Sequence, residues 1–138
     1  MLKGRIPLPD EAATRALGAA LSLEVAAGDV VLLDGPLGAG KTTLVRGFLE
    51  ARGHEEPVRS PTFNLIQAFD TDPPVMHADL YRLTSAEGVG LEDYLETHVC
   101  LIEWPDRLRG LVDPGACWRV RLAFSDGGRE ALVEPPSF

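Results

Sequence analysis

The residues from Gly35 to Thr42 match the pattern GxxxxGK[ST] in full. Glycines in such a loop let successive backbone N–H groups approach a phosphate without a side chain in the way. Lys41 supplies a full positive charge between β- and γ-phosphates, and the hydroxyl of Thr42 can ligate Mg²⁺. The segment predicts a nucleotide-phosphate site formed by Leu37, Gly38, Ala39, Gly40, Lys41, Thr42 and Thr43.

Phosphate chemistry of this kind also needs carboxylates close to the loop, usually at the ends of apolar strands. Glu103 directly follows the apolar run 99–102, and Asp79 closes the run 75–78. Both are therefore candidates for holding Mg²⁺ or the attacking water. Thr62, in the segment Ser-Pro-Thr-Phe, stands where many P-loop enzymes carry a threonine that senses the γ-phosphate; the alternative is a plain turn into a strand.

The base of the nucleotide is partly determined by what the sequence lacks. A guanine-binding protein normally carries Asn-Lys-x-Asp, but the single asparagine, Asn64, has no lysine after it. No DxxG motif occurs either. Adenine is therefore the favoured base.

These residues need a scaffold, and the periodicity of apolar residues predicts an α/β one. Asp10 is a suitable N-cap for a helix that continues to Leu23, and a second helix is expected over 41–52, closed by Gly53. The run 30–34, apolar without alternation, is typical of a strand covered on both faces. Further strands are expected at 63–69, 75–80 and 99–104, a helix interrupted by glycines at 84–97, and a hairpin at 118–124 and 129–134.

Together these elements predict a single P-loop NTPase domain over 1–138, with three layers, a mixed and mainly parallel sheet, and a C-terminal antiparallel hairpin. A length of 138 residues suits one domain. No apolar run exceeds four residues and the N-terminus has no signal-peptide core, so we expect a cytoplasmic protein without a membrane segment.

The net charge of −8 is unevenly distributed, with −7 of it in residues 70–138. Phosphate backbones attract clustered lysine and arginine, so direct binding to a nucleic acid is disfavoured. A basic protein partner for the second half of the chain fits this charge better.

Several short motifs in a fixed order resemble one family. GPLGAGKTT at 35–43 is followed by SPTF at 60–63, HADLYR at 77–82, GLEDYL at 90–95 and IEWPDR at 102–107. This succession looks like TsaE, formerly YjeE, the bacterial ATPase family of tRNA threonylcarbamoyladenosine biosynthesis. The resemblance extends over nearly the whole chain, from Thr14 to the hairpin with Arg129.

The resemblance implies a protein that binds ATP or ADP with Mg²⁺ and joins the TsaB–TsaD complex. ATP hydrolysis would support repeated transfer of threonylcarbamoyl to tRNA, which the chain would contact only indirectly through the complex. We then expect Lys41 to carry the phosphate charge, Thr42 and Glu103 to hold Mg²⁺, Asp79 to orient or deprotonate water, Thr62 to sense the γ-phosphate, and Arg129 to lie against adenine.

Two alternatives remain at this point. A small-molecule kinase of the shikimate or nucleoside type would use Arg107 and Arg109 as lid arginines and Asp79 as base, although such kinases usually need a longer chain. A nucleotide-binding module without hydrolysis would keep the loop and dispense with Asp79.

Overall fold

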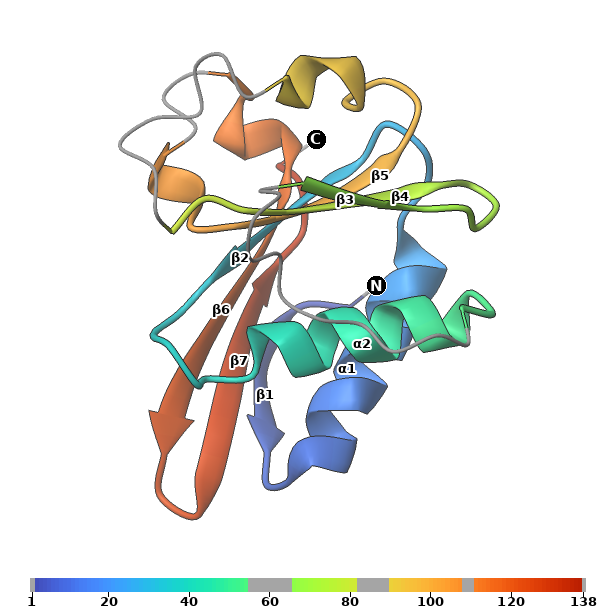
Figure 1. Ribbon diagram of the computed structural model, residues 1–138. Coiled ribbons are helices and arrows are strands. Elements are labelled where there is room, and N and C mark those ends of the chain that lie inside the picture. The colour runs from blue at the N-terminus through green and yellow to red at the C-terminus, as the bar shows by residue number, and fades with distance from the viewer. Residues whose placement is uncertain (1, 55–65, 82–89, 108–110, 138) are drawn as a thin grey trace.

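A mixed β-sheet forms the centre of the protein (Figure 1). The computed structural model describes residues 2–54, 66–81, 90–107 and 111–137. Within this part of the chain the sheet has seven strands in the order β1-β7-β6-β2-β5-β4-β3. The strands are β1 (Gly4–Leu8), β2 (Val30–Asp34), β3 (Ile66–Phe69), β4 (Val75–Asp79), β5 (Val99–Glu103), β6 (Trp118–Ser125) and β7 (Gly128–Glu134).

The centre of the sheet is parallel and its two edges are antiparallel. Strand β2 lies between β5 and β6, and β4 lies beside β5, all in parallel. Strands β7 and β1 extend one side and β3 the other, each antiparallel to its neighbour. The two residues Asp126 and Gly127 connect β6 to β7, which confirms the predicted hairpin.

Two α-helices cover one face of the sheet (Figure 1). Helix α1 (Glu11–Glu24) begins at the predicted cap, where the Asp10 side chain accepts the Ala13 N–H at 2.8 Å. Helix α2 (Lys41–Ala51) has Arg52 as its C-cap, and Gly53 follows with a φ of +85°. The other face carries short 3-10 turns: η1 (Leu91–Asp93), η2 (Pro105–Arg107) and η3 (Pro114–Ala116). The three layers are thus unequal, with α-helices on one side only among the described residues.

Two details differ from the sequence-based expectations. The helix expected at 84–97 is wrong over its described part, where η1 is a single 3-10 turn followed by hydrogen-bonded turns to His98; residues 84–89 lie outside the description. Strand β1 was not predicted at all. Pro7 argues against a strand from sequence, but β1 is at the edge of the sheet, where a residue without an N–H is tolerated. Residues 63–65 of the expected strand 63–69 are also outside the description.

The helices pack unusually close through two glycines. A Cβ built on Gly18 of α1 would lie 2.1 Å from the carbonyl oxygen of Leu44, and one on Gly47 of α2 would lie 2.2 Å from that of Arg15. Backbone atoms cannot move aside as a flexible side chain can. This contact fixes α2, whose first turn belongs to the phosphate loop, against α1.

None of the described helices is long and apolar enough to cross a membrane.

Replacing Gly18 with alanine should lower the free energy of unfolding by about 1–3 kcal/mol, because the helices must separate to admit the methyl group. Alanine is the better helix former, so intrinsic propensity works in the opposite direction. Urea unfolding measures the difference. Leu23→Ala is the control on the same helix, since Leu23 is 89% exposed and its change should cost no more than about 0.5 kcal/mol. Equal effects of the two changes would contradict close backbone contact at Gly18.

Candidate functional site

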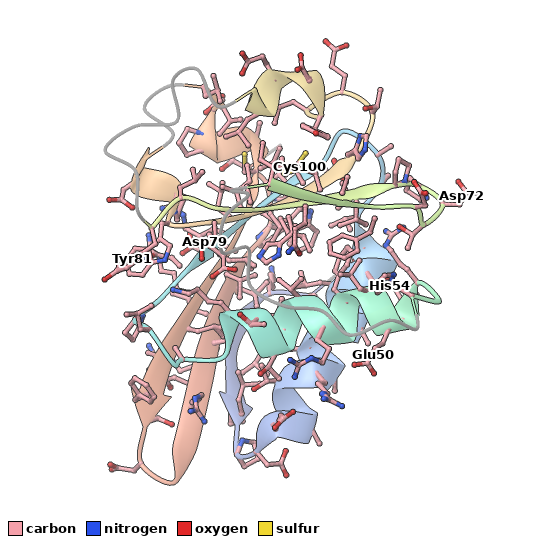
Figure 2. The ribbon with its side chains drawn as sticks, viewed as in Figure 1. Glu50, His54, Asp72, Asp79, Tyr81 and Cys100 are labelled. Atoms are coloured by element: carbon pink, nitrogen blue, oxygen red, sulfur yellow. The ribbon has the colours of Figure 1, made fainter. Side chains whose placement is uncertain are left out.

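The carboxyl ends of the parallel strands bring the loop and both candidate carboxylates to one edge of the sheet. Strand β2 leads into the loop at Gly35, while β4 and β5 end at Asp79 and Glu103. Asp79 pairs with Glu103 in register, and Glu103 also pairs with Leu33 of β2. Figure 2 shows Asp79 and Tyr81 at one end of β4 and Asp72, in the turn before the strand, at the other. Ligands of open α/β sheets bind at this kind of edge.

A pocket of about 270 Å³ lies at this edge. It is lined by Leu37, Gly38, Gly40, Lys41, Thr42, Thr43, Asp79, Glu103 and Trp104. The structure therefore brings together most of the residues singled out by sequence. Ala39 does not line it, because its side chain is buried in the core beneath the loop.

The loop requires glycine where it leaves the sheet. Gly35 has a φ of +145°, and a Cβ at this position would lie 2.5 Å from the carbonyl oxygen of Leu122 on β6. A side chain there would push the loop away from β6. Gly40 has a φ of +111° and is the N-cap of α2. The positive end of that helix, where the first backbone N–H groups lack helical partners, consequently faces the pocket.

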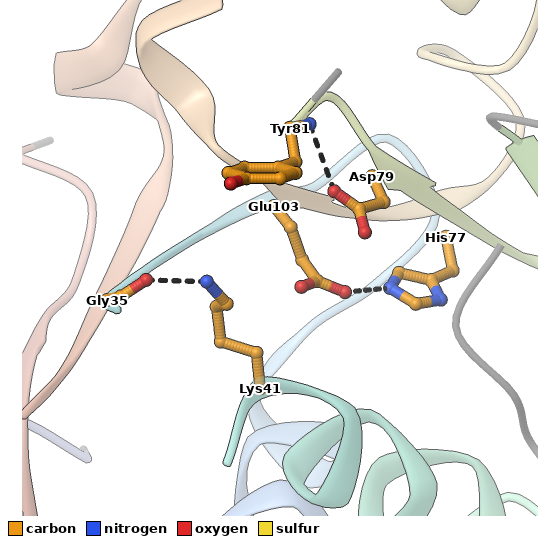
Figure 3. Close-up of polar contacts among 6 residues, drawn as sticks. All are labelled: Gly35, Lys41, His77, Asp79, Tyr81 and Glu103. Atoms are coloured by element: carbon orange, nitrogen blue, oxygen red, sulfur yellow. Dashed lines mark hydrogen bonds and ion pairs between the residues drawn. The ribbon is translucent and has the colours of Figure 1, made fainter. Parts of the chain in front are cut away.

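Lys41 is buried at the floor of the pocket. Its Nζ donates to the Gly35 carbonyl at 2.5 Å and lies 4.1 Å from the centre of the Trp104 ring (Figure 3). Burial lowers the pKa of Lys41 below its usual range, and the negative charges of Glu103, Asp79 and Asp34 oppose that effect. A cation held in this way, without a direct ion pair to a carboxylate in the described structure, is available to a phosphate.

Trp104 covers Lys41 through an unusual backbone conformation. Its φ of +61° is the one positive value outside glycine among the described residues, and its N–H donates to the Leu33 carbonyl at 3.3 Å. The indole is tilted against Tyr81, with ring centres 4.8 Å apart. A bulky residue in the left-handed region is strained, and such strain is concentrated at functional sites. The left-handed backbone of Trp104, directly after β5, thus places the indole over the ammonium group of Lys41.

The two carboxylates differ in their surroundings. Glu103 is buried, and its Oε2 lies 2.6 Å from Nε2 of the buried His77 (Figure 3). Asp79 is partly exposed, and its Oδ1 accepts the backbone N–H of Tyr81 at 3.0 Å. Glu103 is thus held by a side chain inside the protein, whereas Asp79 is oriented from the strand end and remains open to solvent.

Arg129 lies beside the loop, outside the lining of the pocket. Its Nε and Nη2 donate to the Gly38 carbonyl at 3.1 and 2.9 Å, and its guanidinium lies 5.3 Å from the ring centre of Phe124. In this arrangement Arg129 fixes the shape of the loop from the C-terminal hairpin. The expectation that it contacts adenine stays a prediction. Thr62, the expected γ-phosphate sensor, lies outside the described residues.

Sequence reasoning missed two residues of the site, His77 and Trp104. The usable signal for His77 was its position two residues before Asp79 in a predicted strand, which puts both side chains on the same face. Trp104 lies between a strand-end carboxylate and Pro105. Nothing in the sequence indicates that its backbone is left-handed.

The donor set suits Mg²⁺ together with a nucleotide rather than a metal bound by protein alone. Thr42, Asp79 and Glu103 offer oxygen atoms to one pocket. The described residues contain no group of three or more histidine, cysteine or acidic side chains able to hold a metal ion. Mg²⁺ typically binds through one or two carboxylates, substrate phosphates and water, which matches these residues.

Residues 8–131 match the family profile described as threonylcarbamoyl adenosine biosynthesis protein TsaE. Relatives named tRNA threonylcarbamoyladenosine biosynthesis protein TsaE include one from Nostoc sp., 39% identical over 95% of this chain and 85% of that protein. Another, from Haemophilus influenzae, is 41% identical over 72% of this chain and 66% of its own length. The crystal structure of Bacillus subtilis YdiB superposes with a TM-score of 0.79 at 32% identity, covering 98% of this chain and 85% of YdiB. This similarity confirms the predicted fold.

The lowered pKa of Lys41 gives a pH dependence of stability. At low pH Lys41 is charged in both states, so folding carries the full cost of burying the charge. That cost disappears as the pH rises through the folded-state pKa to the usual value of 10.5. The free energy of unfolding of the wild type, relative to Lys41→Met, should therefore increase over this window. Urea unfolding of both proteins at matched pH measures it. A difference that decreases with pH would mean that the carboxylates outweigh burial.

Proposed function

The chain belongs to the TsaE family of threonylcarbamoyladenosine biosynthesis proteins, and on this premise we propose that it is an ATP-binding, ATP-hydrolysing subunit. In this role it supports transfer of threonylcarbamoyl to adenosine in tRNA by the TsaB–TsaD complex. One observation carries the proposal: a single pocket joins the phosphate loop, a buried lysine and two strand-end carboxylates.

Nucleotide binding rests on the loop, the start of α2 and Lys41. The N–H groups of the first helical turn would bind the phosphates, and Lys41 would exchange the Gly35 carbonyl for phosphate oxygens. A carbonyl oxygen carries only a partial negative charge, so a phosphate is the stronger partner for a buried ammonium group. Adenine remains the proposed base, with ATP or ADP as the nucleotide.

Thr42 and Glu103 are the proposed Mg²⁺ ligands, since both line the pocket together with Lys41. When bound, Mg²⁺ would neutralise charge on the β- and γ-phosphate oxygens. Glu103 would act through the oxygen that His77 leaves free. Its strand position, at the end of a buried parallel strand, holds that oxygen close to the loop.

Hydrolysis requires a group that orients and deprotonates water, and we assign this to Asp79. The Tyr81 N–H binds one of its oxygens, which leaves the other to accept a hydrogen bond from water. Asp79 is also the more exposed carboxylate, so water has access to it. Glu103, which is buried and paired with His77, is less suited to that role.

The proposed partner is the TsaB–TsaD protein complex, with tRNA contacted only through it. The net charge of −7 in residues 70–138 supports contact with protein rather than with the RNA backbone. The pocket includes exposed Leu37, and the exposed rings of Tyr81 and Phe124 lie near its lining residues. A cytoplasmic location is part of this proposal.

Two other functions were considered. A small-molecule kinase would need Arg107 and Arg109 as lid residues; Arg107 belongs to η2, and Arg109 lies outside the described residues. Family membership supports the tRNA-modification role instead. A nucleotide-binding module without hydrolysis would have the same pocket and is distinguished by the role of Asp79.

Glu103→Gln and Asp79→Asn should affect different measurements. Glu103→Gln should raise the Mg²⁺ concentration needed for half-maximal ATP binding by about tenfold, which corresponds to ~1.4 kcal/mol. Asp79→Asn should leave the Kd for ATP unchanged and reduce turnover by about 10²-fold or more, as expected for loss of a general base. Calorimetry with Mg²⁺ titration and steady-state phosphate release measure both. Exchanged phenotypes would reverse the two roles, and unchanged turnover in Asp79→Asn would contradict its role as base.

Turnover should rise when the TsaB–TsaD complex is added. Of the residues that line the pocket, Leu37 is exposed and Asp79 is partly exposed. Bulk water there weakens the fixed donors that stabilise developing charge, so the isolated chain should hydrolyse ATP slowly. A partner that covers the pocket would exclude this water. Thr62→Ala should lower stimulated turnover more than it lowers ATP binding. Lys41→Ala removes the positive charge that would face the phosphates, so it should lower ATP affinity by about tenfold or more and lower stimulated turnover as well. Phosphate release is measured at matched ATP saturation. Equal rates with and without the complex would contradict the proposal.

A further inference from the structure

His77 is the one buried histidine of the described structure, and the roles proposed above do not use it. It lies on β4 with Asp79 two residues further along, so both side chains are on the face covered by the helices. Asp79 pairs with Glu103, and His77 pairs with Leu101. The imidazole therefore reaches diagonally across to the carboxylate of Glu103, which is two pairs further along the ladder and the next one on the same face (Figure 3).

The direction of this hydrogen bond follows from the chemistry of both groups. A carboxylate only accepts, so Nε2 of His77 must carry the hydrogen that lies between it and Oε2 of Glu103. Nδ1 is buried and has no hydrogen-bond partner among the described residues. A hydrogen at Nδ1 would be a buried donor without an acceptor, which is unfavourable. The arrangement favours a hydrogen on Nε2 and none on Nδ1.

This bond restricts the carboxylate at the pocket. The terminal torsion of a glutamate is broad, so an unattached carboxylate would rotate. With Oε2 bound to His77, the other oxygen of Glu103 is directed to the side on which Lys41 lies (Figure 3). Glu103 is also the strongest of the carboxylate charges acting on Lys41. The oxygen offered to the pocket therefore has a fixed direction.

An apolar side chain would fill the space of His77 without leaving a buried nitrogen unpaired. Apart from Asp79 and Glu103 at the carboxyl ends, the other positions on the same face of β4 and β5 are apolar. They are Val75, Val99 and Leu101. A polar ring with one unpaired nitrogen lowers the stability of the protein at this position. The imbalance at Nδ1 points to function rather than packing.

We propose that His77 is a positioning residue that fixes the Glu103 carboxylate in the orientation that binds Mg²⁺ with the nucleotide. This rests on the proposed function, in which Glu103 is a metal ligand. Hydrogen-bond partners of metal ligands typically contribute 10–100-fold to metal affinity, through orientation and without touching the metal.

His77→Gln and His77→Met form a matched pair, because the two side chains have similar length and volume but only glutamine retains a donor. His77→Met should raise the Mg²⁺ concentration for half-maximal ADP binding by about tenfold, whereas His77→Gln should stay within about threefold of wild type. Both should bind ADP as wild type does without Mg²⁺. In a Glu103→Gln background, His77→Met should cause no further change, because its effect passes through the carboxylate. Thermal unfolding of each variant monitors the fold.

Equal Mg²⁺ shifts in the two variants, or a shift that persists in Glu103→Gln, would overturn the positioning role and leave the proposed function intact. A wild-type chain whose ADP binding does not depend on Mg²⁺ would overturn the proposed function itself and this role with it. A second measurement needs neither nucleotide nor metal. Nitrogen NMR of the His77 ring in the full chain should show hydrogen on Nε2 and none on Nδ1; hydrogen on Nδ1 alone would overturn the proposed bond.

Discussion

The burial of one positive charge organises the site. Lys41 projects from the first turn of α2 into a space bounded by Trp104, the Gly35 carbonyl and the ends of β4 and β5. Burial acts against the charged form, and the nearby carboxylates act in its favour, with burial the larger effect. A ligand that brings negative charge next to the ammonium group would offset the cost of its burial. The buried positive charge of Lys41, as well as the shape of the loop, therefore favours an anionic ligand in the pocket.

The parallel register of β4 and β5 determines which side chains lie on the same face as the pocket. Alternation along β4 directs His77 and Asp79 to the helical face, and alternation along β5 does the same for Glu103. Met76, Ala78, Cys100 and Ile102 occupy the opposite face and pack beneath the 3-10 turns. A slip of one residue in either strand would exchange these sets and place apolar side chains in the pocket. Core packing on the second face therefore maintains the chemistry on the first.

The sequence predicted the parts of the protein that depend on local patterns. The phosphate loop, the starts of α1 and α2 and the two strand-end carboxylates have short, specific signatures. The structure brings the loop, the start of α2 and both carboxylates into one pocket. Strand β1 was not predicted because it contains Pro7. Proline is tolerated in an edge strand, and only the whole sheet shows that β1 is at the edge. The periodicity at 84–97 suggested a helix, but Gly90 has a φ of +91° and opens a single 3-10 turn. His77 and Trp104 contact residues far away in the sequence, Glu103 and Lys41, and no local pattern records such contacts.

The brace between Arg129 and Gly38 joins residues 91 positions apart. Ribosomes release a chain from its N-terminus, so the loop emerges long before the hairpin that holds it. Strand β2, which carries the loop, likewise has both its partners, β5 and β6, later in the chain. A nascent chain therefore contains the complete nucleotide motif without the surroundings that give it shape. A chain released early in translation would therefore carry the loop sequence without the strands that flank β2 and without the arginine that holds Gly38.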